Sequence, residues 1–256
     1  MIGISEEQLM AWLSPIIWPF LRTLAMFTAA PVFSQRTIPV RVKVGLAFLV
    51  AVCAQPVLDQ PVVAVNSPEA LNCVIQQVGI GIAIGLAARM VIAAMEVAGE
   101  FIGLQMGLSF ASFFDPTSGS QLSAVSRFLV QIFTLFFIVV NGHLFVLMAV
   151  IKSFDAFPVN GSFLQAVSQM RLHELGGEVF ASALWIALPM MALLLFVNLT
   201  MGVIARIAPQ MNVFAIGFPI TLTVGMLGIT ATLPMMEQPF MAMIERTLRV
   251  FGGGFL

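Results

Sequence analysis

Three long stretches of the sequence carry no charged side chain: Phe128–Ile151, Val179–Ala205 and Ile207–Met236. Each exceeds the roughly 20 apolar residues that cross a bilayer core as a helix. Over the whole chain 9% of the residues are charged and 60% are hydrophobic, whereas a water-soluble domain normally carries about a quarter charged residues. We therefore predict an all-α, membrane-associated protein.

Three further hydrophobic stretches are poorer candidates for crossing a membrane. Leu9–Phe33 contains Pro15, Pro19 and the charged Arg22, and Leu71–Phe110 is long and interrupted by charges. Val44–Leu58 is about 15 residues long, which is short for a crossing. We count about six hydrophobic helical segments, several of them kinked or broken, and expect the poorer ones to pack against protein rather than lipid. The charges predicted to be buried in them are Arg22, Arg89, Glu96 and Glu100.

Glycines recur at four-residue spacing along the segment Leu71–Phe110. Gly99, Gly103 and Gly107 would lie on one face of a helix, where the missing side chains let another helix backbone approach closely. We predict that this face packs against a neighbouring helix.

Glu96 and Glu100 stand one helical turn apart on the same predicted helix, and like charges at this spacing repel each other. Inside a membrane they would need water, a proton or a cation, and the available cations are Arg22, Arg127 and Arg206. Ion pairs between segments, or an exposed stretch, are the simpler interpretations. A proton or ion pathway is the alternative.

Basic residues are densest in the loop Ser34–Lys43. Short basic loops tend to stay in the cytoplasm, which would place the N-terminus outside. Counting alternate crossings then places Arg246 and Arg249 outside as well, against the same rule. The charge pattern therefore does not decide the topology.

The sequence shows no catalytic, metal-binding or phosphate-binding pattern, and its two histidines, His143 and His173, stand apart. Cys53 and Cys73 lack metal-site spacing and lie in apolar runs, so we expect both to be buried as small hydrophobic residues. A net charge of −1 provides no basic field for nucleic acid. We predict a protein without enzymatic activity, cofactor or metal.

The decapeptide GLSFASFFDP, Gly107–Pro116, follows a long apolar segment. The residue before a proline avoids the helical region, and the small polar residues that follow favour turns, so we expect the helix to end near Phe113. Irregular backbone at membrane depth is tolerated only where it is buried in protein or lines a water-filled cavity. The phenylalanine-rich loop is predicted to face an interior or a lumen; an ordinary helix end at an interface is the alternative.

A second break lies between two charge-free stretches, at Pro209. Because proline ends a helix, the region predicts a helical hairpin with a polar tip, which can bind a neighbouring subunit or face water. The residues predicted at the tip and its subunit contact are Arg206, Pro209, Gln210, Asn212, Gly217, Phe218 and Pro219.

The C-terminal stretch predicts an amphipathic helix, because apolar residues recur there at helical spacing opposite charged ones. The apolar face comprises Phe240, Met243, Ile244, Leu248 and Phe251, and the charged face Glu245, Arg246 and Arg249.

Four phrases of the sequence, taken in order, resemble the FliR family, the R-type subunits of flagellar export gates and their counterparts in virulence type III secretion. They are RTLAMFTAAPVF at Arg22–Phe33, IPVRVK at Ile38–Lys43, GLQMGLSFASFFDP at Gly103–Pro116 and RIAPQMNVFAIGFP at Arg206–Pro219. The resemblance covers essentially the whole chain, and the combination of order, spacing and length makes it specific.

The resemblance implies a structural, non-enzymatic subunit of the protein-export channel of the flagellar type III secretion apparatus, in the bacterial inner membrane at the flagellar basal body. Such subunits assemble with P-type and Q-type subunits and other inner-membrane export components, and the gate passes unfolded protein substrates. The resemblance further implies a P-subunit-like region over residues 1–177 and a Q-subunit-like hairpin with an amphipathic tail over residues 178–256.

The resemblance also implies that residues 106–121 form a plug in the closed channel. In that role Phe110 and Phe113 would project into the pore as an apolar stopper, because a dry constriction blocks ions, and Phe114 would anchor the loop. The residues carried over as plug or gate are Met106, Phe110, Phe113, Phe114, Asp115 and Pro116.

A secondary transporter is the alternative from a different class of protein. In that interpretation Glu96 and Glu100 would couple ions, and the helices broken at Pro209 would form the substrate site. An internal inverted repeat would favour a transporter, and we find none in the sequence.

Overall fold

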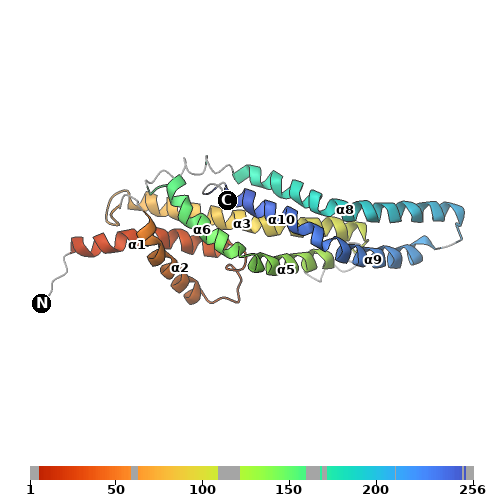
Figure 1. Ribbon diagram of the computed structural model, residues 1–256, viewed down its shortest axis with the longest axis horizontal. Coiled ribbons are helices and arrows are strands. Elements are labelled where there is room, and N and C mark those ends of the chain that lie inside the picture. Colours follow the sequence, from red (N-terminus) through yellow and green to blue (C-terminus); the bar gives the residue numbers. More distant parts are fainter. Residues whose placement is uncertain are drawn as a thin grey trace. The chain divides into compact units, whose positions relative to one another are not determined.

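The computed structural model describes residues 6–58, 63–108, 122–159, 168, 172–210, 212–249 and 251. All regular structure in these ranges is helical (Figure 1), which confirms the predicted all-α class. In chain order the elements are α1 (Glu6–Ala29), α2 (Val40–Ala54), η1 (Gln55–Val57), α3 (Ala70–Gln105), α5 (Ala124–Val139), α6 (Gly142–Ala156), α8 (Leu172–Ile207), α9 (Val213–Thr232), η3 (Leu233–Met236) and α10 (Glu237–Arg249).

Contacts within the chain define two compact units. Unit 1 comprises residues 1–90, 137–176 and 244–256, and unit 2 comprises residues 91–136 and 177–243. The long helix α3 therefore contributes its first part to unit 1 and its second part to unit 2. The expected boundary between residues 177 and 178 lies at one edge of unit 2, and the P-like and Q-like character of the two halves stays a prediction.

Within the described residues, four helical stretches are long and apolar enough to cross a membrane. The bent pair α5 and α6 adds a fifth if it counts as one span. The four stretches are Val40–Val57, Ala70–Gln105, Glu174–Ile207 and Ala215–Thr247.

The stretch Phe128–Ile151, expected to be a single span, is broken in two. α5 and α6 meet at an angle of 65°, and Asn141 between them has a left-handed φ of 59°. Asparagine tolerates this conformation better than most residues. It is followed by Gly142, where a Cβ atom would come within 2.5 Å of the Phe137 ring. The Asn-Gly pair thus produces a bend that hydropathy does not reveal.

α3 ends at Gln105, several residues before the expected end near Phe113. Gly107 adopts a left-handed φ of 80°, its N–H donates to the carbonyl of Leu104 at 3.1 Å, and the N–H of Leu108 donates to the carbonyl of Gly103 at 3.0 Å. This is a Schellman motif, in which glycine closes the last helical turn. Gly107, expected to pack against a helix, is therefore a helix stop.

The predicted hairpin is formed by α8 and α9 (Figure 1). α8 ends at Ile207, and the Asn212 side chain accepts a hydrogen bond from the N–H of Ala215 at 3.3 Å, which caps the first turn of α9. Several threonine hydroxyls on the hairpin donate back to carbonyl oxygens three or four residues earlier in the same helix, namely those of Thr200, Thr223 and Thr230.

The predicted amphipathic helix at the C-terminus is present as α10. Its charged residues Glu245, Arg246 and Arg249 are exposed. The buried residues of the expected apolar face are Phe240, Met243, Ile244 and Phe251.

Candidate functional site

The two flanks of the predicted plug loop lie against the same end of α3 in unit 2. A Cβ atom at Gly103 would come within 2.7 Å of the Ser123 hydroxyl oxygen, and one at Gly99 within 2.9 Å of the Ser126 nitrogen. The two glycines thus let the start of α5 rest directly on α3. The described chain leaves α3 at Met106 and returns beside Gly103, about one helical turn away.

Glu100 holds the segment that follows the predicted plug loop, at the start of α5. Its carboxylate oxygen Oε1 accepts the N–H of Ser123 at 2.7 Å, and the Ser123 hydroxyl in turn accepts the N–H of Ser126 at 3.1 Å. Ser123 therefore acts as the N-cap of α5, and Glu100 holds this cap in place. The Ser126 hydroxyl donates to the carbonyl oxygen of Glu96 at 2.8 Å, which adds a second bond to α3.

The two carboxylates are half-buried. Among the described residues, neither Glu96 nor Glu100 forms an ion pair with any of the three arginines named from the sequence. For Glu100 a backbone N–H takes the place of a cation, so of the two simpler interpretations the ion pair does not hold there.

Met106 holds the segment that precedes the predicted plug loop, at the end of α3. Its side chain is fully buried and lies where Gly225 of α9 has no side chain, since a Cβ atom there would come within 2.7 Å of the Met106 sulfur. The main-chain oxygen of Met106 accepts a hydrogen bond from the Thr221 hydroxyl at 3.3 Å. Met106, expected to be part of the plug, is thus packed against α9. The other predicted plug residues lie outside the described residues: Phe110, Phe113, Phe114, Asp115 and Pro116.

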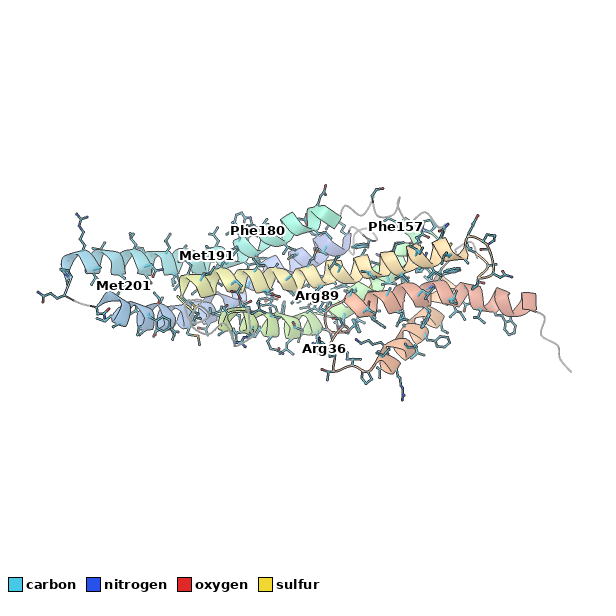
Figure 2. The ribbon with its side chains drawn as sticks, turned by 180° about the vertical axis from the view of Figure 1, so that it is seen from behind. Arg36, Arg89, Phe157, Phe180, Met191 and Met201 are labelled. Atoms are coloured by element: carbon cyan, nitrogen blue, oxygen red, sulfur yellow. The ribbon has the colours of Figure 1, made fainter. Side chains whose placement is uncertain are left out.

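The hairpin of unit 2 uses the same combination of glycine and methionine. A Cβ atom at Gly228 of α9 would meet the Met190 sulfur of α8 at 2.6 Å, and one at Gly217 would meet the end of Met201 at 3.6 Å. Met201 is labelled on α8 in Figure 2. Many outward side chains of the hairpin are large and apolar, and the most exposed of them are Trp185, Leu195, Phe196, Leu199, Ile207 and Leu227.

The residues predicted at the hairpin tip divide into two groups. Arg206, Pro209 and Gln210 are exposed at or next to the turn, whereas Gly217, Phe218 and Pro219 lie inside α9. Gly217 is half-buried and Phe218 is exposed. Their predicted contact with another subunit stays a prediction.

Arg22 forms a buried polar cluster in unit 1. Its Nε donates to Gln77 Oε1 at 2.7 Å, one terminal nitrogen donates to the Ser153 hydroxyl at 2.8 Å, and the other donates to the main-chain oxygen of Phe157 at 2.9 Å. The guanidinium carbon lies 3.5 Å from the centre of the Phe154 ring, a cation–π contact. This Arg22 cluster joins α1, α3 and the end of α6, where Figure 2 labels Phe157.

The charge of Arg22 is thus satisfied by neutral oxygen atoms and a ring face. Burial lowers the pKa of the Arg22 guanidinium below its usual value, while hydrogen bonds to three oxygens favour the protonated form. Sequence reasoning identified Arg22 as a buried charge but missed its partners. A usable signal was the pair Gln76-Gln77, which interrupts an apolar helix; Gln76 donates to the Pro158 carbonyl at 3.1 Å.

Two expectations about burial are wrong. Arg89, expected to be buried, is exposed and shares a face of α3 with the exposed residues Ile82 and Leu86. Cys53, also expected to be buried, is exposed on α2, whereas Cys73 is buried.

Known proteins match this chain over most of its length. Residues 13–247 match the family described as bacterial export proteins, family 1. The flagellar biosynthetic protein FliR of Escherichia coli (strain K12) is 40% identical over 240 residues, covering 94% of this chain and 92% of the relative. The protein of the same name from Pectobacterium carotovorum is also 40% identical with the same coverage. The one from Bacillus subtilis (strain 168) is 31% identical over 208 residues, 80% of each chain. The chain therefore belongs to the FliR family of bacterial export proteins.

Proposed function

We propose that the protein is a structural subunit of the gate through which the flagellar apparatus exports proteins, with other subunits covering much of its apolar surface. Its family makes it a membrane-embedded component of the flagellar export apparatus, which has other export components as its partners. The proposal adds the bacterial inner membrane at the flagellar basal body as its location, P-type and Q-type subunits as neighbours and unfolded proteins as substrates.

The observation that carries this proposal is the length of the exposed apolar surface on α8. Phe180 is 58% exposed near its beginning and Ile207 is 77% exposed at its end, which at 1.5 Å per residue are about 40 Å apart. A bilayer core is about 30 Å thick, and an average tilt of about 20° shortens the surface only to roughly 38 Å. Part of this surface therefore extends past the hydrocarbon core into the headgroup region, and we propose that other subunits cover it there.

The plug role proposed for the loop at residues 106–121 is supported by how the two ends of that loop are held. Met106 is fixed by α9 and Ser123 by Glu100, so the described chain leaves and rejoins the fold at one end of α3. Flanks fixed in this way suit a segment that must keep its position while substrates pass. In the proposal, Phe110 and Phe113 form the apolar stopper of the closed pore.

The transporter alternative assigned ion coupling to Glu96 and Glu100. Glu100 instead has a structural role, because its carboxylate holds the N-cap of α5. No contact of the described residues favours a transporter over an export subunit.

The assembly part of the proposal is tested by purification from native membranes. A tagged chain should co-purify with P-type and Q-type subunits in one particle, whose mass is measured in detergent. Recovery of the chain alone, or as a stable homodimer in lipid, would contradict the proposal.

The plug part is tested separately by ion conductance. Replacing Phe110 and Phe113 together by alanine should make the assembled gate leak small ions, measured as conductance in planar bilayers. The matched control replaces two exposed phenylalanines of α2 and α5, Phe48 and Phe128, by alanine and should leave the gate closed to ions. Equal conductance of both double variants would rule out the plug role.

A further inference from the structure

α2 is packed with its small side chains inward and its large ones outward. Its buried residues are Ala47, Ala51 and Ala54, which form one stripe on the helix, and α2 packs against α1. The opposite arrangement is expected for a helix in water, where large apolar residues are buried. The large apolar side chains that α2 and η1 expose are Val40, Val42, Val44, Leu46, Phe48, Leu49, Val52 and Val57.

These exposed side chains extend far around the helix. At about 100° per residue, the positions from Val44 through Phe48 and Leu49 to Leu46 cover an arc of about 200°. A single neighbouring helix contacts one stripe of such a surface. Lipid acyl chains, by contrast, surround a helix on every side that protein leaves open. A Cβ atom built at Gly45 would have nothing within 4 Å, so this side of α2 has no close neighbour within the described chain.

The charge at the start of α2 is positive and uncompensated. Arg36 and Arg41 are exposed (Figure 2 labels Arg36, in the loop before α2), and neither forms an ion pair with any residue that the structure describes. Lys43 is half-buried and donates to the carbonyl of Gln35 at 3.4 Å. The sequence from Ser34 to Leu58 contains no acidic residue. An anionic surface therefore complements this end of the helix.

We propose that α2 enters the membrane with Arg36, Arg41 and Lys43 at the headgroups of anionic phospholipids, while acyl chains cover its large apolar side chains. Basic residues next to an apolar segment bind anionic membrane surfaces in this way, and cations at a helix end reach back to the interface. The inference goes beyond the gate function proposed above, because it assigns lipid rather than protein to this part of the surface.

The proposal places one natural thiol at a defined depth. Cys53 is exposed on α2, ten residues after Lys43, which corresponds to about 15 Å along the helix. The hydrocarbon core is about 30 Å thick, so Cys53 should lie near its centre when Lys43 is at the headgroups. Because Cys73 is buried, a thiol reagent applied to the folded chain should label Cys53 selectively.

The depth is measured by fluorescence quenching. The full chain, co-purified with its export partners, is labelled at Cys53 with an environment-sensitive fluorophore and reconstituted in bilayers of phosphatidylglycerol and phosphatidylcholine. Nitroxide lipids carry the quencher at the headgroup or near the end of the acyl chain. We expect several-fold stronger quenching by the deep nitroxide. Stronger quenching by the headgroup nitroxide would overturn the insertion, and absence of quenching by both would show that protein covers α2.

The lipid charge is tested with matched variants. R36Q/R41Q removes two exposed arginines before and within α2, and the control R246Q/R249Q removes two exposed arginines from α10. The phosphatidylglycerol content retained by each purified protein from an equimolar mixture is measured by mass spectrometry. At about 1 kcal/mol per basic residue near an anionic surface, the loss of two arginines corresponds to about 2 kcal/mol, so the first variant should bind phosphatidylglycerol roughly thirtyfold more weakly. The control should match the unmodified protein.

Each result decides the proposal. Equal retention by R36Q/R41Q and the unmodified protein, or equal losses in both variants, would overturn the assignment of anionic lipid to α2. If R36Q/R41Q fails to fold, the depth measurement on the unmodified chain still decides the insertion.

Discussion

The contact between α1 and α3 in unit 1 and the contacts of α9 in unit 2 both depend on glycine, but what lies opposite the glycine differs. At Gly85 of α3 a Cβ atom would come within 2.7 Å of the backbone oxygen of Met26. At Gly225 of α9 it would meet the flexible end of Met106 at 2.5 Å. Backbone cannot move aside without shifting a helix, whereas a methionine side chain has three rotatable bonds.

Hydrogen bonding increases this difference. The Arg22 cluster adds three side-chain hydrogen bonds to unit 1, and they join α1 to α3 and to the end of α6. Hydrogen bonds depend on direction, so the Arg22 cluster permits only one arrangement of its helices. A methionine side chain packed against a glycine can change its conformation, which permits small shifts between α9 and its neighbours. The helix contacts of unit 1 are therefore rigid, whereas the contacts of α9 can adjust by rotation of methionine side chains.

The largest expected effect is the loss of the Arg22 cluster. Arg22→Met would leave the oxygens of Gln77, Ser153 and Phe157 without this donor, and each buried unsatisfied group costs about 1–3 kcal/mol. We expect the free energy of unfolding to fall by about 3 kcal/mol or more, measured by equilibrium denaturation in mixed micelles. Arg22→Lys keeps the charge but not the planar fork and should lose less. An Arg22→Met chain as stable as the unmodified protein would remove the basis of the comparison.

The second effect tests the rigid backbone contact. Gly85→Ala should destabilise unit 1 by about 1–3 kcal/mol, because the new methyl group meets the backbone of α1 and overpacks the contact. The matched control is Gly45→Ala, whose methyl group would have nothing within 4 Å. It should be neutral or stabilising by up to about 1 kcal/mol, since alanine favours the helix. Thermal unfolding of both variants measures the difference, and equal melting temperatures would contradict it.

A smaller effect is expected at Glu100. Glu100→Ala removes the acceptor that holds Ser123 and should cost about 1 kcal/mol, as the loss of a helix cap does. Glu100→Gln keeps an oxygen at this position and should retain most of the stability. The two variants are compared by denaturation and by the ion conductance of the assembled gate. If they lose stability equally, the hydrogen bond to Ser123 is not what Glu100 contributes.

The smallest effect is expected at Gly228, which faces a flexible methionine side chain. Gly228→Ala places a methyl group against the end of Met190, which can turn away, and alanine gains helix propensity over glycine. The net change should stay within about 0.5 kcal/mol, measured by the same denaturation as for Gly85→Ala. A loss as large as that of Gly85→Ala would show that the α9 contacts are as rigid as those of unit 1.

Local patterns predicted the elements that depend on local chemistry. The amphipathic spacing of α10 and the proline between α8 and α9 led to the correct helices. The early stop of α3 was also encoded locally, in Gly107, but its glycine spacing suggested helix packing. The bend at Asn141 was indicated by the Asn-Gly pair. Because this pair lies inside a long apolar stretch, hydropathy alone predicted one continuous helix there.

The candidate site was less predictable because its contacts join distant parts of the chain. The partners of Arg22 lie 55, 131 and 135 residues away, and no local pattern relates them. The same holds for Met106 and Thr221, which are 115 residues apart. The residue type shows that a buried arginine or a buried main-chain oxygen needs a hydrogen-bond partner. Which residue becomes that partner is determined by the fold.

The threonines of the α8–α9 hairpin carry a consequence for whatever surrounds it. Thr200, Thr223 and Thr230 are exposed, yet each hydroxyl proton is already given to a carbonyl of its own helix. Toward the outside these residues present mainly a methyl group, much as valine does. Hydropathy scales count threonine as hydrophilic and therefore underestimate the apolar character of the hairpin surface. Between its polar tip and its ends, the hairpin therefore presents a largely apolar exterior, and a neighbour must fit it mainly by shape.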